Sequence, residues 1–146
     1  MSPAKLNIQH FVCQIRDGRL TPIRLDGEPR NLFGLPATQK ERLYVVKCGG
    51  KFCYVGVTRQ SMTSRMRQHL DRWNGLSKVN LYVYATELNT KGAETIEAEL
   101  VFLIRKKTGK WPTHQTEIHF HNLMRIPNKT HRETAENLFG RLRKLR

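Results

Sequence analysis

The chain has 146 residues, and its 26 Lys and Arg against 12 Asp and Glu give a formal net charge of +14. This length supports one domain with a real core and excludes two large ones, and the charge excess indicates a polyanionic partner, nucleic acid before an anionic membrane surface. No apolar run approaches the ~20 residues of a membrane span, and the first residues lack the apolar stretch of a secretory signal. Three cysteines without a secreted-scaffold pattern favour a reducing cytoplasm.

The first forty residues are expected to form an extension that contains some β-structure. Residues 11–15 (FVCQI) have strand composition, Asp17-Gly18 is a turn dipeptide, and residues 20–25 can return as a second strand. A second Asp-Gly and two prolines interrupt the chain between residues 26 and 36. We therefore set residues 1–41 apart as an N-terminal extension.

A hairpin and a helix come next. Residues 43–47 and 52–57 are rich in Val, Tyr and Phe and flank Gly49-Gly50, which predicts a β-hairpin. Ser61 is a suitable N-cap for a helix over 62–73. In that helix Met62, Met66, Leu70 and Trp73 form an apolar stripe, and a neighbouring stripe carries Arg65, His69 and Arg72.

The second half of the chain alternates strands and helices. Residues 79–86 alternate like a strand, 93–107 form a mostly buried helix ended by Gly109, and 117–121 form a short strand. A capping-box sequence at Thr130 opens a basic last helix within 123–146. The order β-β-α-β-α-β-α predicts an α+β fold, with a small, mostly antiparallel central sheet flanked by helices.

Residues 40–78 gather side chains that suit phosphodiester hydrolysis. Tyr44, Tyr54, Arg65 and His69 fall within the hairpin and its following helix, among nine basic and two acidic residues. The reaction needs a base for the attacking water and positive charge around the phosphate. Surrounding cationic groups and a nearby metal ion favour a phenolate and so lower the pKa of a tyrosine, which would let one of these phenols act as the base.

This segment resembles the GIY-YIG nuclease family. Residues 42–44 (RLY) stand where the family has Gly-Ile-Tyr, and residues 54–56 (YVG) stand where it has Tyr-Ile-Gly, at the right separation. The family's arginine then falls on Arg65, and the tyrosine or histidine one turn later falls on His69. The resemblance covers residues 42–122, which we take as the nuclease core.

The resemblance implies an endonuclease that uses one divalent metal ion, Mg²⁺ or alternatively Mn²⁺. Glu97 would hold the ion, because two aliphatic residues follow it at the family's spacing; Glu99 is the alternative. Glu97 also shares the apolar face of its helix, where a buried carboxylate needs a partner. In this scheme Arg65 stabilises the phosphate, Tyr44 activates water, and Tyr54 and His69 orient the nucleophile or share its proton.

The partner expected from these features is DNA, single- or double-stranded. Lys47, Arg59, Arg67 and Arg72 are the candidate phosphate contacts. Trp73, Trp111 and Phe120 lie near basic residues and would suit stacking with unpaired bases, although each would suit a core equally. The family often has an asparagine at the end of its core, and in this chain Gln115 or Asn122 would take that position.

Two other functions fit the same residues. One is a basic nucleic-acid-binding module that keeps the fold without cutting. The other is a zinc-stabilised interaction domain, with Cys48 and Cys53 at the edge of the usual zinc-ligand spacing and with His119 and His121 on one side of a strand. The sequence does not define an oligomeric state.

Overall fold

The computed structural model describes residues 6–23, 38–68, 79–88, 92–113 and 129–145. Within these ranges no helix has the length and apolar character needed to cross a bilayer. The elements, in chain order, are β1 (Gln9–Arg16), β2 (Arg19–Ile23), β3 (Glu41–Cys48), β4 (Lys51–Thr58), α1 (Met62–Gln68), β5 (Leu81–Leu88), α2 (Ala93–Thr108) and α4 (Lys129–Leu142).

The five strands form one antiparallel sheet in the order β2-β1-β5-β3-β4. The expected α+β fold is therefore confirmed. The predicted hairpin of residues 43–57 is present as β3 and β4, which turn at Gly49 and Gly50, both with positive φ. Strand β1 pairs with β5, so the hairpin of the N-terminal extension belongs to the same sheet as the β3–β4 hairpin.

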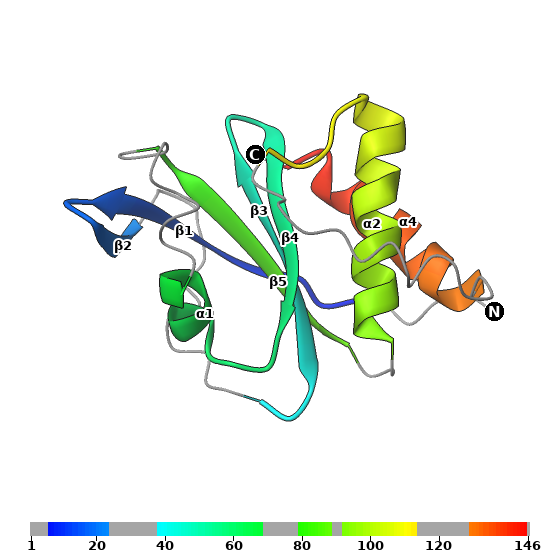
Figure 1. The fold of residues 1–146 in the computed structure, drawn as a ribbon, viewed down its shortest axis with the longest axis horizontal. Helices are drawn as coiled ribbons and strands as arrows, with labels where there is room; N and C mark the ends of the chain where they lie inside the picture. Colours follow the sequence, from blue (N-terminus) through cyan, green and yellow to red (C-terminus); the bar gives the residue numbers. More distant parts are fainter. Residues whose placement is uncertain (1–5, 24–37, 69–78, 89–91, 114–128, 146) are drawn as a thin grey trace.

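Helices cover both faces of the sheet. Alternate residues of β3 point to opposite sides: Leu43 and Val45 join the core under α2 and α4, whereas Tyr44 and Val46 join the core under α1. Figure 1 shows α1 on one side of the sheet and α2 with α4 on the other. The sheet therefore separates the side chains of α1 from those of α2.

Two helix ends agree with the sequence prediction. The Ser61 hydroxyl accepts a hydrogen bond from the Ser64 backbone N–H at 3.2 Å, so Ser61 caps α1. Gly109 ends α2 in the left-handed conformation, at φ 80°, and its N–H donates to the Arg105 carbonyl at 2.9 Å. The predicted continuation of α1 to Trp73 and the predicted strand over 117–121 lie outside the described residues.

Candidate active site

The β3–β4 hairpin places two phenols on the α1 face of the sheet. In the register of the hairpin, Tyr44 stands opposite Gly56 and Val46 stands opposite Tyr54. The two tyrosines are thus diagonal neighbours on one face. Their ring centroids are 5.8 Å apart, and both side chains are buried.

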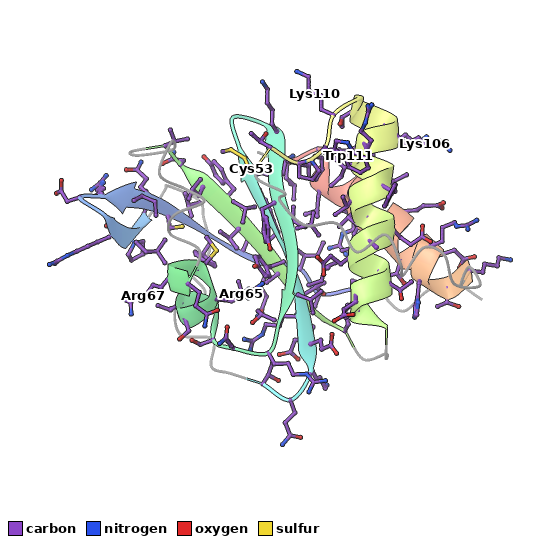
Figure 2. The ribbon with its side chains drawn as sticks, in the orientation of Figure 1. Cys53, Arg65, Arg67, Lys106, Lys110 and Trp111 are labelled. Carbon is purple, nitrogen blue, oxygen red and sulfur yellow. A yellow bond between two sulfur atoms is a disulfide. The ribbon has the colours of Figure 1, made fainter. Side chains whose placement is uncertain are left out.

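Helix α1 brings a guanidinium to these phenols. Met62 and Met66 are fully buried and fix the helix on the sheet. Arg65 lies between them, and its Nε donates a hydrogen bond to the Tyr44 hydroxyl at 2.9 Å. Figure 2 shows Arg65 on the side of α1 that faces the sheet and Arg67 on the outer side. The structure therefore joins Tyr44, Tyr54 and Arg65, three of the five predicted catalytic residues.

The protonation of this cluster differs from the sequence-based expectation. Burial raises the pKa of Tyr44 well above its ordinary value, and the neighbouring Tyr54 raises it further, while Arg65 lowers it by less. Loss of solvent thus outweighs the one guanidinium, so the expectation that basic side chains lower the pKa of Tyr44 is wrong; the expected effect of a metal ion on this pKa stays a prediction. Partial burial alone would lower the pKa of Arg65, but Tyr44 and Tyr54 raise it overall. At neutral pH the cluster is a protonated phenol beside a charged guanidinium.

Gly56 is required by the position of the Tyr44 ring. A Cβ at residue 56 would lie 2.6 Å from both Cζ and Oη of Tyr44, much closer than carbon atoms approach one another. The glycine of the Tyr-Val-Gly motif thus leaves room for the phenol that Arg65 contacts. This contact explains why a strand otherwise rich in large residues carries glycine at this point.

We expect Gly56→Ala to displace the Tyr44 phenol and to lower the free energy of unfolding by about 1–3 kcal/mol, the usual cost of overpacking. Gly140→Ala is the matched control, since a Cβ there meets nothing within 4 Å and α4 gains from a better helix former. Urea unfolding of both variants measures the difference. Equal stability of the two variants would contradict the close approach of Tyr44 to Gly56.

Glu97 occupies the buried face of α2 that the sequence predicted for it. Its side chain is 7% exposed, and its helix neighbours Ala93 and Val101 belong to the core on the α2 face of the sheet. That core lies across the sheet from the Tyr44 ring. Among the described residues, Glu97 is not one of the charged groups that shift the pKa of Tyr44 or Arg65. The structure therefore brings the tyrosines and arginine together without this carboxylate.

Lys47 is a structural residue, which corrects its predicted role as a phosphate contact. Its side chain is fully buried, and its Nζ donates hydrogen bonds to the carbonyls of Leu142 and Leu145 at 2.7 and 2.6 Å. The ammonium also lies 4.8 Å from the centroid of the Phe52 ring. Lys47 therefore caps the carboxyl end of α4 and is withdrawn from solvent.

Two other predicted DNA contacts remain at the surface. Arg67 is exposed on the outer side of α1. Arg59 has a side chain that is 65% exposed and forms an ion pair with Glu41 at 3.2 Å. Exposed pairs of this kind contribute little to stability, so Arg59 can exchange its carboxylate for a phosphate at small cost.

The cysteines of the hairpin are oxidised in the structure. Cys48 and Cys53 form a disulfide across the Gly49–Gly50 turn, with 6.4 Å between their Cα atoms, and Cys13 is free and buried. Zinc binds thiolates, which a disulfide lacks. The zinc hypothesis and the expectation of reduced thiols are therefore wrong for this pair. The sequence signal that could have found the disulfide is the placement of two cysteines on either side of a tight turn.

Several predicted residues lie outside the described part of the chain: His69, Arg72, Gln115, Asn122, His119 and His121. Within the described part, no group of three or more His, Cys, Asp or Glu side chains is arranged to hold a metal ion. Comparisons of the chain with family models, with curated proteins and with solved structures give no match.

Proposed function

We propose that this chain is a metal-dependent endonuclease that hydrolyses DNA phosphodiester bonds, with Arg65 contacting the scissile phosphate. The observation that supports this most is the 2.9 Å hydrogen bond from Arg65 Nε to the buried Tyr44 hydroxyl, beside Tyr54. A guanidinium has five N–H donors. When a hydrogen bond holds its Nε, other N–H groups of the same side chain can still donate to phosphate oxygens. The phenols thus orient a phosphate-binding group in advance of its ligand.

The role of Tyr44 in water activation follows from its protonation. Burial keeps its proton on at neutral pH, so in this state Tyr44 orients Arg65 instead of accepting a proton. A divalent cation would favour the phenolate and neutralise charge on the phosphate. Glu97 is the proposed metal ligand. Among the described residues it lies across the sheet from Tyr44, so an ion held by Glu97 alone would not act on the Tyr44 phenol.

The pH dependence of cutting tests whether Tyr44 must lose its proton. Because its pKa is raised, the deprotonated fraction grows with pH throughout the neutral and mildly alkaline range. We expect the logarithm of the cleavage rate to rise by about one for each pH unit between pH 7 and about 9. A rate that levels off below about pH 8 would assign the base to another group. Tyr44→Phe is the control, and it should remove this dependence.

Nicking of supercoiled plasmid tests the proposed activity directly. The full chain with Mg²⁺ is expected to convert the plasmid to open-circular and linear forms, and EDTA is expected to stop this conversion. Glu97→Ala should lose cutting while still shifting the plasmid in a gel. Glu94→Ala is the matched control, at an exposed position of the same helix, and Glu99→Ala tests the alternative ligand. Full activity of Glu97→Ala would remove this residue from the proposal.

The second candidate function is a nucleic-acid-binding module that does not cut. One observation favours it: Tyr44 is buried and protonated, and Glu97 is on the far side of the sheet. In that case the plasmid would be bound but stay intact with Mg²⁺ and with Mn²⁺ at every pH. Cutting by the wild type that disappears in Arg65→Ala would exclude this alternative.

A further inference from the structure

The carboxyl end of α2 carries an exposed aromatic ring within a cluster of cations. We call it the Trp111 surface and define it by Phe102, Arg105, Lys106, Lys107, Lys110 and Trp111. Trp111 is 38% exposed, and it is one of three large hydrophobic residues that are exposed in the described part of the chain. All four basic residues are exposed as well. Figure 2 shows Trp111 on the side of α2 that faces the β3–β4 turn, with Lys110 above it and Lys106 on the other side of the helix in this view, and all three at a distance from Arg65 on α1.

The Trp111 ring is held in place before any ligand arrives. Phe102 contacts it edge-on, at 5.1 Å between centroids and 85° between planes, and the Arg105 guanidinium lies 5.8 Å from its centroid. Arg105 also donates a hydrogen bond to the Gly109 carbonyl, which ties it to the end of the helix. Beyond the ring, buried Pro112 and a 3.2 Å hydrogen bond from Thr113 N–H to the Phe52 carbonyl fix the chain on strand β4. A ring fixed in this way loses little conformational entropy when it stacks.

The charges around Trp111 select the class of ligand. Residues 100–113 contain four basic and no acidic residues. Within the described residues, Lys106, Lys107 and Lys110 form no ion pair. Basic residues are common at the carboxyl end of a helix, where they interact favourably with the helix dipole. That dipole is equivalent to about half a negative charge, so it does not account for four basic residues, and it gives no reason for an exposed indole. Cations around a fixed, exposed aromatic ring match a chain of phosphates that carries accessible bases.

From this arrangement we propose that the Trp111 surface binds single-stranded nucleic acid, with an unpaired base stacked on Trp111 and flanking phosphates at Lys106 and Lys110. A duplex keeps its bases stacked on one another and offers the indole no free base face. The surface therefore distinguishes an unpaired strand from a duplex without reading its sequence. The inference goes beyond the endonuclease proposal, because it concerns binding at a surface remote from Arg65.

Fluorescence anisotropy with labelled oligonucleotides tests this proposal on the full chain, in EDTA so that no strand is cut. The probes are one mixed-sequence DNA strand, the same strand as a duplex, and RNA of the same sequence. Trp111→Leu is expected to weaken binding of the single strand by roughly tenfold, within the range for base–aromatic stacking, and to leave duplex binding unchanged. Trp111→Tyr should restore most of the affinity. The RNA arm decides whether the strand must be DNA.

Salt dependence tests the lysines separately. Lys106→Gln/Lys110→Gln should reduce the slope of log affinity against log salt by about 1.4, since each phosphate contact of a single strand contributes about 0.7. Lys129→Gln/Arg132→Gln removes the same charge from exposed positions at the start of α4 and should leave the slope unchanged. Equal slopes for the two double variants, or equal losses of single-strand and duplex binding in Trp111→Leu, would overturn the proposal.

Binding measured by anisotropy in EDTA also distinguishes failure of the Trp111 binding site from failure of the nuclease proposal. Arg65→Ala removes at most one phosphate contact on α1, so it should weaken single-strand and duplex binding to the same small extent, whereas Trp111→Leu should weaken only single-strand binding. If the wild type never cuts but its binding depends on Trp111, the binding site stands and the nuclease proposal fails. If the wild type cuts DNA and Trp111→Leu binds the single strand normally, the nuclease proposal stands and the proposed binding site at Trp111 fails.

Discussion

Arg65→Ala is expected to reduce plasmid cutting by about 10²–10³-fold, far more than it weakens DNA binding. The magnitude is typical for the loss of one group that stabilises charge in a transition state. The substitution also removes the donor to the buried Tyr44 hydroxyl, so the free energy of unfolding should fall by about 1–3 kcal/mol. Arg65→Lys should recover little of this activity, because an ammonium cannot reproduce the planar fork that donates to the Tyr44 hydroxyl and to a phosphate together. The measurement is the initial rate of nicking at saturating Mg²⁺.

Arg67→Ala is the matched control for this prediction. It removes the same charge from the same helix two residues away, from a side chain that points to solvent on the outer side of α1. A general electrostatic effect would make the two variants equally slow. If Arg67→Ala lost as much activity as Arg65→Ala, the specific role of the Tyr44–Arg65 pair would be contradicted.

Lys47→Ala is expected to lower the free energy of unfolding by about 3 kcal/mol. The substitution removes the two hydrogen bonds that satisfy the carbonyls of Leu142 and Leu145, and each charge-assisted bond of this kind contributes roughly 1.5–3 kcal/mol. It also leaves a cavity beside Phe52, where the lysine stem now packs. For a chain of this size the loss corresponds to a fall in Tm of about 6–12 °C, measurable by circular dichroism.

Two further variants separate the causes of this destabilisation. Lys47→Met keeps the apolar part of the side chain and removes only the hydrogen-bond donor, so its free energy of unfolding should lie between those of the wild type and Lys47→Ala. Lys51→Met makes the same change at an exposed position of β4 and should have little effect. If Lys47→Met and Lys51→Met had the same Tm, the cap on α4 would contribute nothing.

Burial of Lys47 also predicts a dependence of stability on pH. Loss of solvent lowers the pKa of Lys47 in the folded chain, so in the alkaline range the unfolded chain binds more protons than the folded one. Stability therefore rises with pH as it passes from the lowered pKa toward the ordinary lysine value. Lys47→Met should lack this rise, and Lys51→Met should keep it.

Local residue patterns were sufficient to predict most of the fold. Val, Tyr and Phe on either side of Gly49-Gly50 predicted the β3–β4 hairpin, Ser61 predicted the start of α1, and Gly109 predicted the end of α2. The inward position of Glu97 followed from helical periodicity alone. Each of these features depends on interactions between residues near one another in the sequence, and this is why the sequence predicts them.

Other features depend on residues distant in the sequence. Lys47 appears in the sequence as one more cation, and only the docking of α4, 95 residues later, makes it an internal cap. Tyr44 appears as a phenol among cations, but the packing of α1 and the strands around it removes water and raises its pKa. The sequence by itself determined which side chains the hairpin and helices carry. The tertiary structure decided which of them reach solvent and which face of the sheet each one meets, because solvent exposure depends on how all the elements pack.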